Sequence, residues 1–120
     1  AKKIVFSGGL SPGQSTNATA ALIAERTKAK LFVNATDVDG VFTSDPRKNK
    51  NAKLIKSITT KNLLSKVVDN KMSAGTYDLM DLLSLKIIER SKIPTIVIKC
   101  DSGRIKSAIS GKSKGTKITS

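Results

Sequence analysis

Two apolar runs around one alanine-rich segment limit most strongly what this chain can fold into. The run KKIVF, residues 2–6, predicts a buried strand, and AKLFVNAT, residues 29–36, predicts a second one. Between them NATAALIAE, residues 17–25, has the alanine content and apolar spacing of a helix. Strand, helix and strand in this order form a βαβ unit, which has a right-handed crossover and parallel strands. The chain is therefore predicted to contain a parallel sheet.

The rest of the chain continues the alternation of helices and strands. Helical patterns occupy residues 59–70, 79–91 and 103–110, and strand patterns occupy residues 94–100 and 115–120, with a loop over residues 73–78. No repeat, low-complexity tract or linker divides the sequence. We therefore expect residues 1–120 to form a single layered α/β domain.

The loop SGGLSPGQS, residues 7–15, joins the first predicted strand to the first predicted helix. Ser15 or Thr16 is a candidate N-cap, and the free N–H groups at such a helix start attract an anion. A tight turn with an ordinary cap explains the same residues equally well. The glycine spacing of Gly8 and Gly13 fits a Walker A loop, but Gln14 stands where the lysine should be, and no G-x-G-x-x-G fingerprint occurs.

The segment TDVDGVFTSDPRKNKNAKLI, residues 36–55, follows the second predicted strand. Gly40 falls two positions too early for a calcium loop, so calcium is disfavoured. The VDG and SDP triplets instead indicate turns on either side of a short extended piece. Either this is a turn-rich surface loop, or it is the edge of a nucleotide site in which Asp45 contacts ribose or base and Phe42 packs on the base.

The charge of the chain is strongly positive but evenly distributed. The formal net charge is +13, and the two halves carry 10 basic with 4 acidic and 12 basic with 5 acidic side chains. This pattern favours a solvated lysine-rich surface over a nucleic-acid-binding tail. The only aromatic residues are Phe6, Phe32, Phe42 and Tyr77, too few for a base-stacking platform, so nucleic acid is not an expected partner.

Several chemistries are excluded by what the sequence lacks. Cys100 is the only cysteine and there is no histidine, which rules out an internal disulfide, Ser–His or Cys–His catalysis and a cysteine metal cluster. No apolar run is long enough to span a membrane, and no signal-peptide pattern opens the sequence. We expect a cytoplasmic protein with no membrane partner.

Four segments together resemble one family. They are SGGLSPGQSTNATAALIAE, LFVNATDVDGVFTSDPRKNKNAKLI, AGTYDLMDLLSLKIIERSKIPTIVI and GKSKGTKI, and they resemble the carboxyl-terminal half of an archaeal-type uridylate kinase of the amino acid kinase superfamily. The resemblance implies a three-layer α/β/α sandwich with a mainly parallel sheet. It also implies an enzyme that transfers the γ-phosphoryl group of ATP, with magnesium, to UMP and so makes UDP.

The resemblance also assigns site residues. The UMP-binding positions would be Leu10, Ser11, Pro12, Gly13, Gln14, Ser15 and Thr16, and the ATP-binding positions would be Thr36, Asp37, Phe42 and Asp45. No protein metal ligand is assigned. Asn17 departs from the Asp that many members of the superfamily carry, and Leu82 stands where a Pro is common at a helix start.

The amino-terminal half of the family has no counterpart in this sequence. Its lysine, its glycine-rich phosphate loop and the remaining UMP-pocket residues lie there, so catalytic residues are expected outside the matched part and the chain alone is expected to have negligible activity. The complete enzyme is expected to be a hexamer. Alternatives are a phosphotransferase of the same superfamily with another acceptor, or a non-catalytic fragment that binds nucleotide or nucleic acid.

Overall fold

The fold is built on a four-stranded sheet. The computed structural model describes residues 3–9, 11–12, 15–68 and 80–120. The strands β1 (Phe32–Thr36), β2 (Ser57–Thr59), β3 (Thr95–Lys99) and β4 (Thr116–Thr119) lie in the order β1-β3-β4-β2. The pairs β1–β3 and β2–β4 are parallel, whereas β3–β4 is antiparallel. The prediction of a mainly parallel sheet is confirmed.

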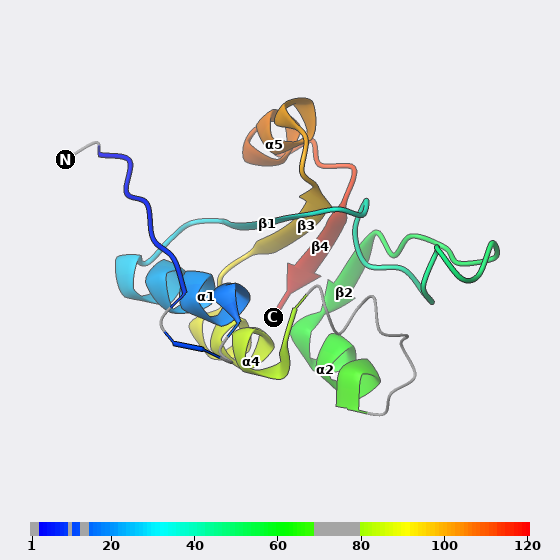
Figure 1. Cartoon of the computed structure of the whole chain (residues 1–120), viewed down its shortest axis with the longest axis horizontal. Helices are drawn as coiled ribbons and strands as arrows, with labels where there is room; N and C mark the ends of the chain where they lie inside the picture. The colour runs from blue at the N-terminus through cyan, green and yellow to red at the C-terminus, as the bar shows by residue number, and fades with distance from the viewer. Residues whose placement is uncertain (1–2, 10, 13–14, 69–79) are drawn as a thin grey trace.

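Helices cover both faces of this sheet. Helices α1 (Thr16–Thr27), α2 (Thr60–Val68) and α4 (Leu82–Ser91) lie on one face, and α5 (Ser102–Ile109) lies on the other (Figure 1). Alternate residues of β3 belong to two separate hydrophobic cores. Val97 packs in the core formed with α1, α2 and α4, whereas Ile96 and Ile98 pack with Ala108 of α5. The predicted three-layer α/β/α arrangement is therefore confirmed.

The ends of α1 follow from its sequence. The Ser15 hydroxyl accepts a hydrogen bond from the Ala18 N–H at 3.1 Å, which confirms Ser15 as the N-cap. The helix ends where Lys28 adopts the left-handed conformation, with φ 53°. Arg90 of α4 binds both carboxylate oxygens of Glu25, at 2.8 and 2.6 Å, and so joins the two helices.

Side-chain caps also mark the starts of α2 and of α5, where Asp101 accepts from the Arg104 N–H at 3.3 Å, whereas the Asp81 side chain makes no cap hydrogen bond to α4. The Thr59 hydroxyl accepts from the Asn62 N–H at 3.1 Å at the start of α2. Helix α4 begins at Leu82, the position where a Pro would also be accepted because the first helical N–H needs no partner. Residues 69–70 of the predicted α2 pattern and the predicted loop 73–78 lie outside the described residues.

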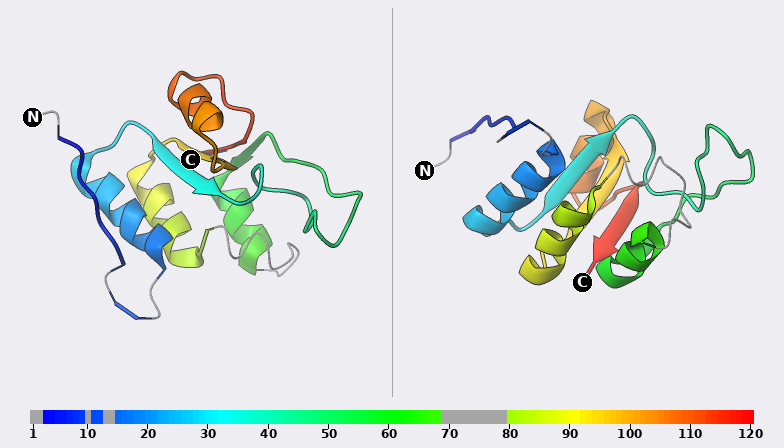
Figure 2. Two further views of the ribbon diagram at one scale, coloured as in Figure 1. Left: turned by 45° about the horizontal axis from the view of Figure 1, so that its top comes forward. Right: turned by 60° about the horizontal axis from the view of Figure 1, so that its bottom comes forward.

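The strand predicted over residues 2–6 is wrong for the described residues 3–6. Ile4, Val5 and Phe6 are 88%, 83% and 92% exposed and belong to no strand. The segment stays apart from the sheet (Figure 2), and only Ser7 and Gly8, which follow it, line a pocket along α1. An apolar run becomes a strand only when a neighbouring strand accepts its backbone hydrogen bonds, and in the described sheet β1 pairs with β3 alone. The predicted βαβ unit around α1 is therefore not formed by the residues that the structure describes.

Candidate functional site

The candidate site begins at the carboxyl edge of β1 and β3. The two strands end together, with Thr36 opposite Lys99, and the Cys100 N–H donates to the Thr36 carbonyl at 2.7 Å. Helices α1 and α4 each lead into one of these parallel strands after a short connection, so their amino ends lie toward the same edge (Figure 2). This edge therefore combines two helix amino-termini with two strand ends, where ligands of α/β sheets collect.

The first predicted binding segment lies at the start of α1. Ser15 is half-buried because its hydroxyl caps the helix, whereas Thr16, Ser11 and Pro12 are exposed. The positions Leu10, Gly13 and Gln14 lie outside the described residues. The exposed start of α1 leaves its first N–H groups accessible to a ligand.

A pocket of about 320 Å³ continues from this segment along α1. Ser7 and Gly8 line it on one side, and α1 lines it with Thr16, Thr19 and neighbouring apolar residues. Thr19 is 4% exposed, and its hydroxyl has no hydrogen-bond partner among the described residues. Local sequence patterns did not indicate this pocket: they predicted a loop over residues 7–15, but not that Ser7 and Gly8 would lie along α1.

The second predicted segment starts with a turn at the end of β1. The Thr36 hydroxyl accepts from the Val38 N–H and donates to the Val38 carbonyl, both at 3.0 Å. This closes the turn and leaves Asp37 exposed at the edge of the sheet. Asp39, farther along the same turn, forms an ion pair with Arg104 of α5. That contact ties the loop to the opposite layer and could not be predicted, because 65 residues separate the partners.

Residues 41–55 form a hairpin-like loop. Phe42 and Leu54 form an antiparallel bridge, and the Ile55 N–H donates to the Val41 carbonyl at 2.8 Å. Phe42 is half-buried, so part of its ring remains available for contact with a ligand. The predicted extended piece between two turns is thereby confirmed.

Thr116 of β4 anchors this loop to the sheet. Its hydroxyl accepts from the Val41 N–H at 2.8 Å and donates to the Ile55 carbonyl at 2.6 Å. Gly40 allows this approach, because a Cβ there would lie 2.6 Å from the same hydroxyl oxygen. The G-T-x-I motif near the end of the sequence thus has a structural role in holding the candidate nucleotide loop.

The Asp45 side chain points toward the backbone of its own loop and not toward solvent. Its side chain is 4% exposed, and its carboxylate accepts from the Arg47 backbone N–H at 2.9 Å and from Arg47 Nε at 3.3 Å. The backbone hydrogen bond is the main cause that lowers the pKa of Asp45, and the guanidinium adds to it, while burial opposes both. Asp45 therefore shapes the turn before Pro46.

We expect the turn at Asp45 to weaken in acid. Because the pKa of Asp45 is lower in the folded chain, its carboxylate stabilises the fold above its unfolded pKa, and this contribution is lost as the pH falls through the folded pKa. The free energy of unfolding of the parent chain should exceed that of Asp45→Asn at neutral pH, and the difference should shrink on acidification. Urea unfolding across the acid range measures this.

A second substitution separates the two effects of Arg47 on the pKa of Asp45, that of its backbone N–H and that of its guanidinium. Arg47→Gln removes the guanidinium but keeps the backbone N–H, so the pKa of Asp45 should stay below its ordinary value in a carboxyl-carbon NMR titration. An Asp45 that returns to its ordinary pKa in this variant would show that the guanidinium, not the backbone N–H, dominates.

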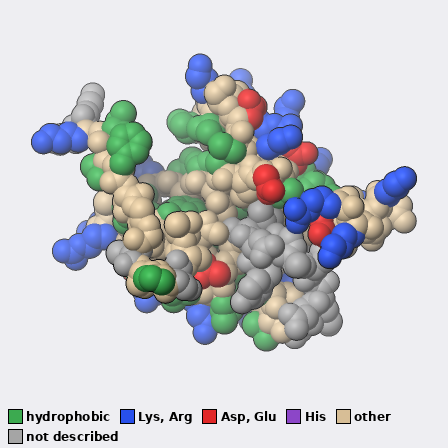
Figure 3. Space-filling model, viewed as in Figure 1, with side chains coloured by type: hydrophobic (Ala, Val, Ile, Leu, Met, Phe, Trp, Pro, Cys, Tyr) green, Lys and Arg blue, Asp and Glu red, His purple; other side chains and the backbone are tan. Residues whose placement is uncertain are grey.

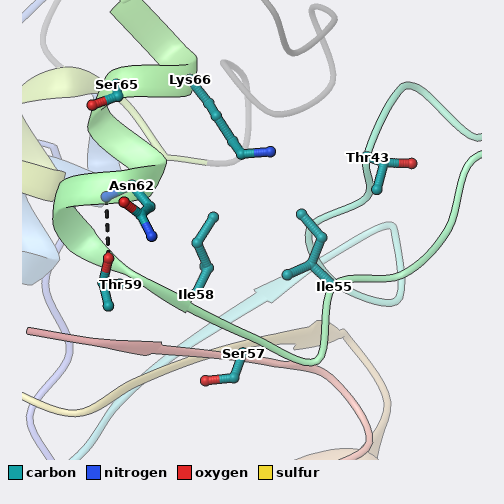
Figure 4. A pocket seen from close by; sticks show the side chains of 8 residues that line it. All are labelled: Thr43, Ile55, Ser57, Ile58, Thr59, Asn62, Ser65 and Lys66. Atoms are coloured by element: carbon teal, nitrogen blue, oxygen red, sulfur yellow. Dashed lines mark hydrogen bonds between the residues drawn. The ribbon is translucent and has the colours of Figure 1, made fainter.

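A larger hollow of about 690 Å³ lies between this loop, β2 and α2 (Figure 4). Thr43 and Ile55 line its loop side, Ile58 forms part of its floor, and Lys66 of α2 reaches over it. Among the described residues, its lining combines hydroxyl groups with one cation, Lys66, and the Thr59–Asn62 cap described above borders it.

Lysines and arginines do not gather on one patch of the face seen in Figure 3, where they are scattered around the outline. This distribution agrees with the predicted solvated lysine-rich surface. Within the described ranges, no helix has the length and apolar character needed to cross a membrane.

A sandwich of this kind, with polar loops and helix amino-termini at the carboxyl edge of parallel strands, is typical of α/β proteins that bind phosphorylated ligands. Residues 2–99 match the amino acid kinase family. The chain belongs to this family.

Curated relatives of the chain within this family include uridylate kinases. The chain is 47% identical over 112 residues to a uridylate kinase of Metallosphaera sedula, covering 91% of this chain and 50% of the relative. It is 47% identical over 117 residues to a uridylate kinase of Methanococcus maripaludis, covering 98% of this chain and 52% of the relative. The chain thus spans about half the length of the curated relatives it matches.

Solved structures agree with this assignment. The crystal structure of uridylate kinase from Archaeoglobus fulgidus superposes with a TM-score of 0.80 at 44% identity, covering 93% of this chain and 50% of that one. Aspartokinase III of E. coli superposes with a TM-score of 0.67 at 28% identity, covering 87% of this chain and 20% of that one. The fold is therefore shared by enzymes with different acceptors.

Proposed function

We propose that this chain is the nucleotide-binding part of a UMP kinase, which transfers the γ-phosphoryl group of ATP to UMP and makes ADP and UDP. The observation that carries the proposal is the common sheet edge: the exposed start of α1 and the loop that follows β1 both lie at the carboxyl ends of β1 and β3. The uridylate kinases among its relatives support the choice of acceptor.

The acceptor side is proposed to lie at the start of α1. The segment Leu10, Ser11, Pro12, Gly13, Gln14, Ser15 and Thr16 would bind UMP. Backbone N–H groups at the helix start donate to phosphate oxygens, and the helix dipole favours the negative charge there. Ser15 holds this helix start in place through its cap to Ala18.

The donor side is proposed to lie on the loop after β1, with Thr36, Asp37, Phe42 and Asp45 as ATP-binding positions. MgATP is the substrate form. Thr36 closes the turn that exposes Asp37 at the sheet edge, the half-buried Phe42 ring offers a surface for the base, and Asp45 holds the turn beyond it. Placing both nucleotides at one edge brings donor and acceptor phosphates together, which is most of what phosphoryl transfer requires of a protein.

Transfer of the phosphoryl group is proposed for the complete enzyme and not for this chain alone. The complete enzyme is proposed to be a cytoplasmic hexamer. The family resemblance places the cations that neutralise the moving phosphoryl group in the amino-terminal half of its members. A few kcal/mol of transition-state stabilisation are commonly lost with each such donor, so this chain by itself should turn over at a negligible rate.

A different acceptor is the second candidate, because aspartokinase III shares the fold. A coupled assay of ADP formation with UMP, CMP, aspartate and isopentenyl phosphate as acceptors separates the two. Only UMP is expected to support turnover by the complete enzyme. Preferred turnover of a carboxylate or isopentenyl phosphate would overturn the assignment.

Binding by the chain itself gives an independent test. We expect UMP to bind more tightly than CMP or AMP, and Thr16→Ala to weaken UMP binding about tenfold, as for loss of one hydrogen bond to a charged group. Thr119→Ala, an exposed threonine of β4 away from α1, is the matched control and should leave binding unchanged. Equal affinity for all nucleotides, falling steeply with salt, would instead indicate nonspecific attraction of polyanions to the +13 charge.

A further inference from the structure

Three lysines line a further pocket, on the part of the sheet that α5 leaves open. The pocket measures about 500 Å³, and Lys56, Lys114 and Lys117 line it together with Leu54, Ser57, Ser113 and Gly115. Leu54 comes from loop 41–55 and pairs with Phe42, but none of the lining residues is among the positions proposed to bind UMP or ATP. The three lysines therefore have no role in the proposed function.

The strand register explains why the lysines lie there. Thr116 and Ile118 of β4 are buried on the side of the three-helix layer, so Lys117 between them projects from the opposite face. On that face α5 packs mainly on β3 and β1, which leaves the β4–β2 part uncovered. Ser57 pairs with Lys117 in the parallel register, and so it lies beside Lys117 on the same face.

The backbone around the pocket is fixed. The Lys117 N–H donates to the Lys56 carbonyl at 3.0 Å, which sets these two lysines on adjacent, paired segments. The Ser113 hydroxyl accepts from the Gly115 N–H at 3.1 Å and closes the turn that carries Lys114. The three cationic stems therefore start from anchored positions.

The charge of the pocket has no internal compensation. No Asp or Glu lines it, and within the described part of the chain none of the three lysines forms an ion pair with a carboxylate. Three ammonium groups beside two hydroxyl groups form a donor set suited to several phosphate oxygens at once. None of the described residues that line the pocket is aromatic, so they offer no surface for stacking a nucleic-acid base.

We propose that this pocket binds a compact oligophosphate, such as inorganic triphosphate or the triphosphate group of a nucleotide, at a site separate from the proposed UMP and ATP segments. Its size suits a short chain of phosphates. An extended nucleic acid would instead engage basic residues spread over a longer surface.

The test is a titration of the chain with inorganic triphosphate at physiological salt, followed by amide NMR. We expect saturable binding that shifts the amides of Gly115 and Lys117. The triple variant Lys56→Gln, Lys114→Gln, Lys117→Gln should lose about tenfold or more in affinity, because each lysine contributes a charge-assisted contact. Thermal unfolding of the variant verifies that it is folded.

The control removes the same charge elsewhere. Lys61→Gln, Lys86→Gln, Lys106→Gln changes three exposed helical lysines and should bind triphosphate as the parent chain does. Equal losses in both triples would show diffuse attraction and overturn the site. Shifts confined to residues 36–37 would place triphosphate at the ATP segment and also overturn it, and so would tighter binding of a single-stranded oligonucleotide through the same lysines. Failure of UMP binding would leave this result unaffected, because the residues differ.

Discussion

Gly115→Ala is expected to destabilise the fold by about 3 kcal/mol or more, at the upper end of what overpacking costs. A Cβ at this position would lie 2.1 Å from the Val97 carbonyl oxygen and 2.6 Å from Ile98 Cγ2. Val97 belongs to the interior strand β3 and is fully buried, so its carbonyl has no room to retreat. Urea unfolding followed by circular dichroism measures the loss.

Gly103→Ala is the matched control for this substitution. Gly103 lies in the first turn of α5, and a Cβ there would make only an ordinary contact, at 3.5 Å from Asp101 Oδ2. Alanine is the better helix former, so this variant should be as stable as the parent or slightly more stable. If Gly115→Ala unfolds at the same urea concentration as Gly103→Ala, the close approach of β4 to β3 is not required.

Thr116→Val should cost about 2–4 kcal/mol of unfolding free energy, because it leaves one buried N–H and one partly buried carbonyl without their partner. Valine fills the same volume but offers no hydroxyl to the Val41 N–H or to the Ile55 carbonyl. The hairpin-like loop 41–55 would then be held less firmly over β4. We expect faster hydrogen exchange at the Val41 amide and weaker ATP binding by the same loop.

Two further substitutions test whether the effect comes from the lost hydroxyl of Thr116 or from any Thr→Val change on this strand. Thr116→Ser keeps the hydroxyl and should restore much of the protection of the Val41 amide. Thr119→Val, on the same strand but exposed, should change neither stability nor exchange beyond a few tenths of a kcal/mol. Protection of Val41 that survives in Thr116→Val would mean that another group holds the loop.

Local sequence patterns predicted most helices and strands correctly. The alanine-rich run at α1 and the β-branched run at β3 carry their own propensity and periodicity, and capping residues such as Ser15 mark where a helix begins. Strand β2, only three residues long, was not predicted, because a segment this short shows no period.

The candidate site was predictable only in part. The loop before α1 and the loop after β1 are recognisable by their glycine, proline and aspartate residues, and the family resemblance implied that they bind nucleotides. The sequence did not indicate that the Asp45 carboxylate is occupied by Arg47, that Asp39 reaches Arg104, or that three lysines line one pocket. Each of these depends on which residues face one another after folding.

The sequence by itself determined the alternation of helices and strands, the family resemblance and the positive charge, because these depend on neighbours along the chain or on composition. Only the tertiary structure decided that the apolar residues 4–6 stay exposed while Val97 is fully buried. Both segments are rich in β-branched residues, but β3 has a paired strand on each side and helices over both faces, whereas no strand among the described residues lies beside residues 3–6. A strand is stabilised by partners that lie far away in the sequence, and no local pattern reports whether they are there.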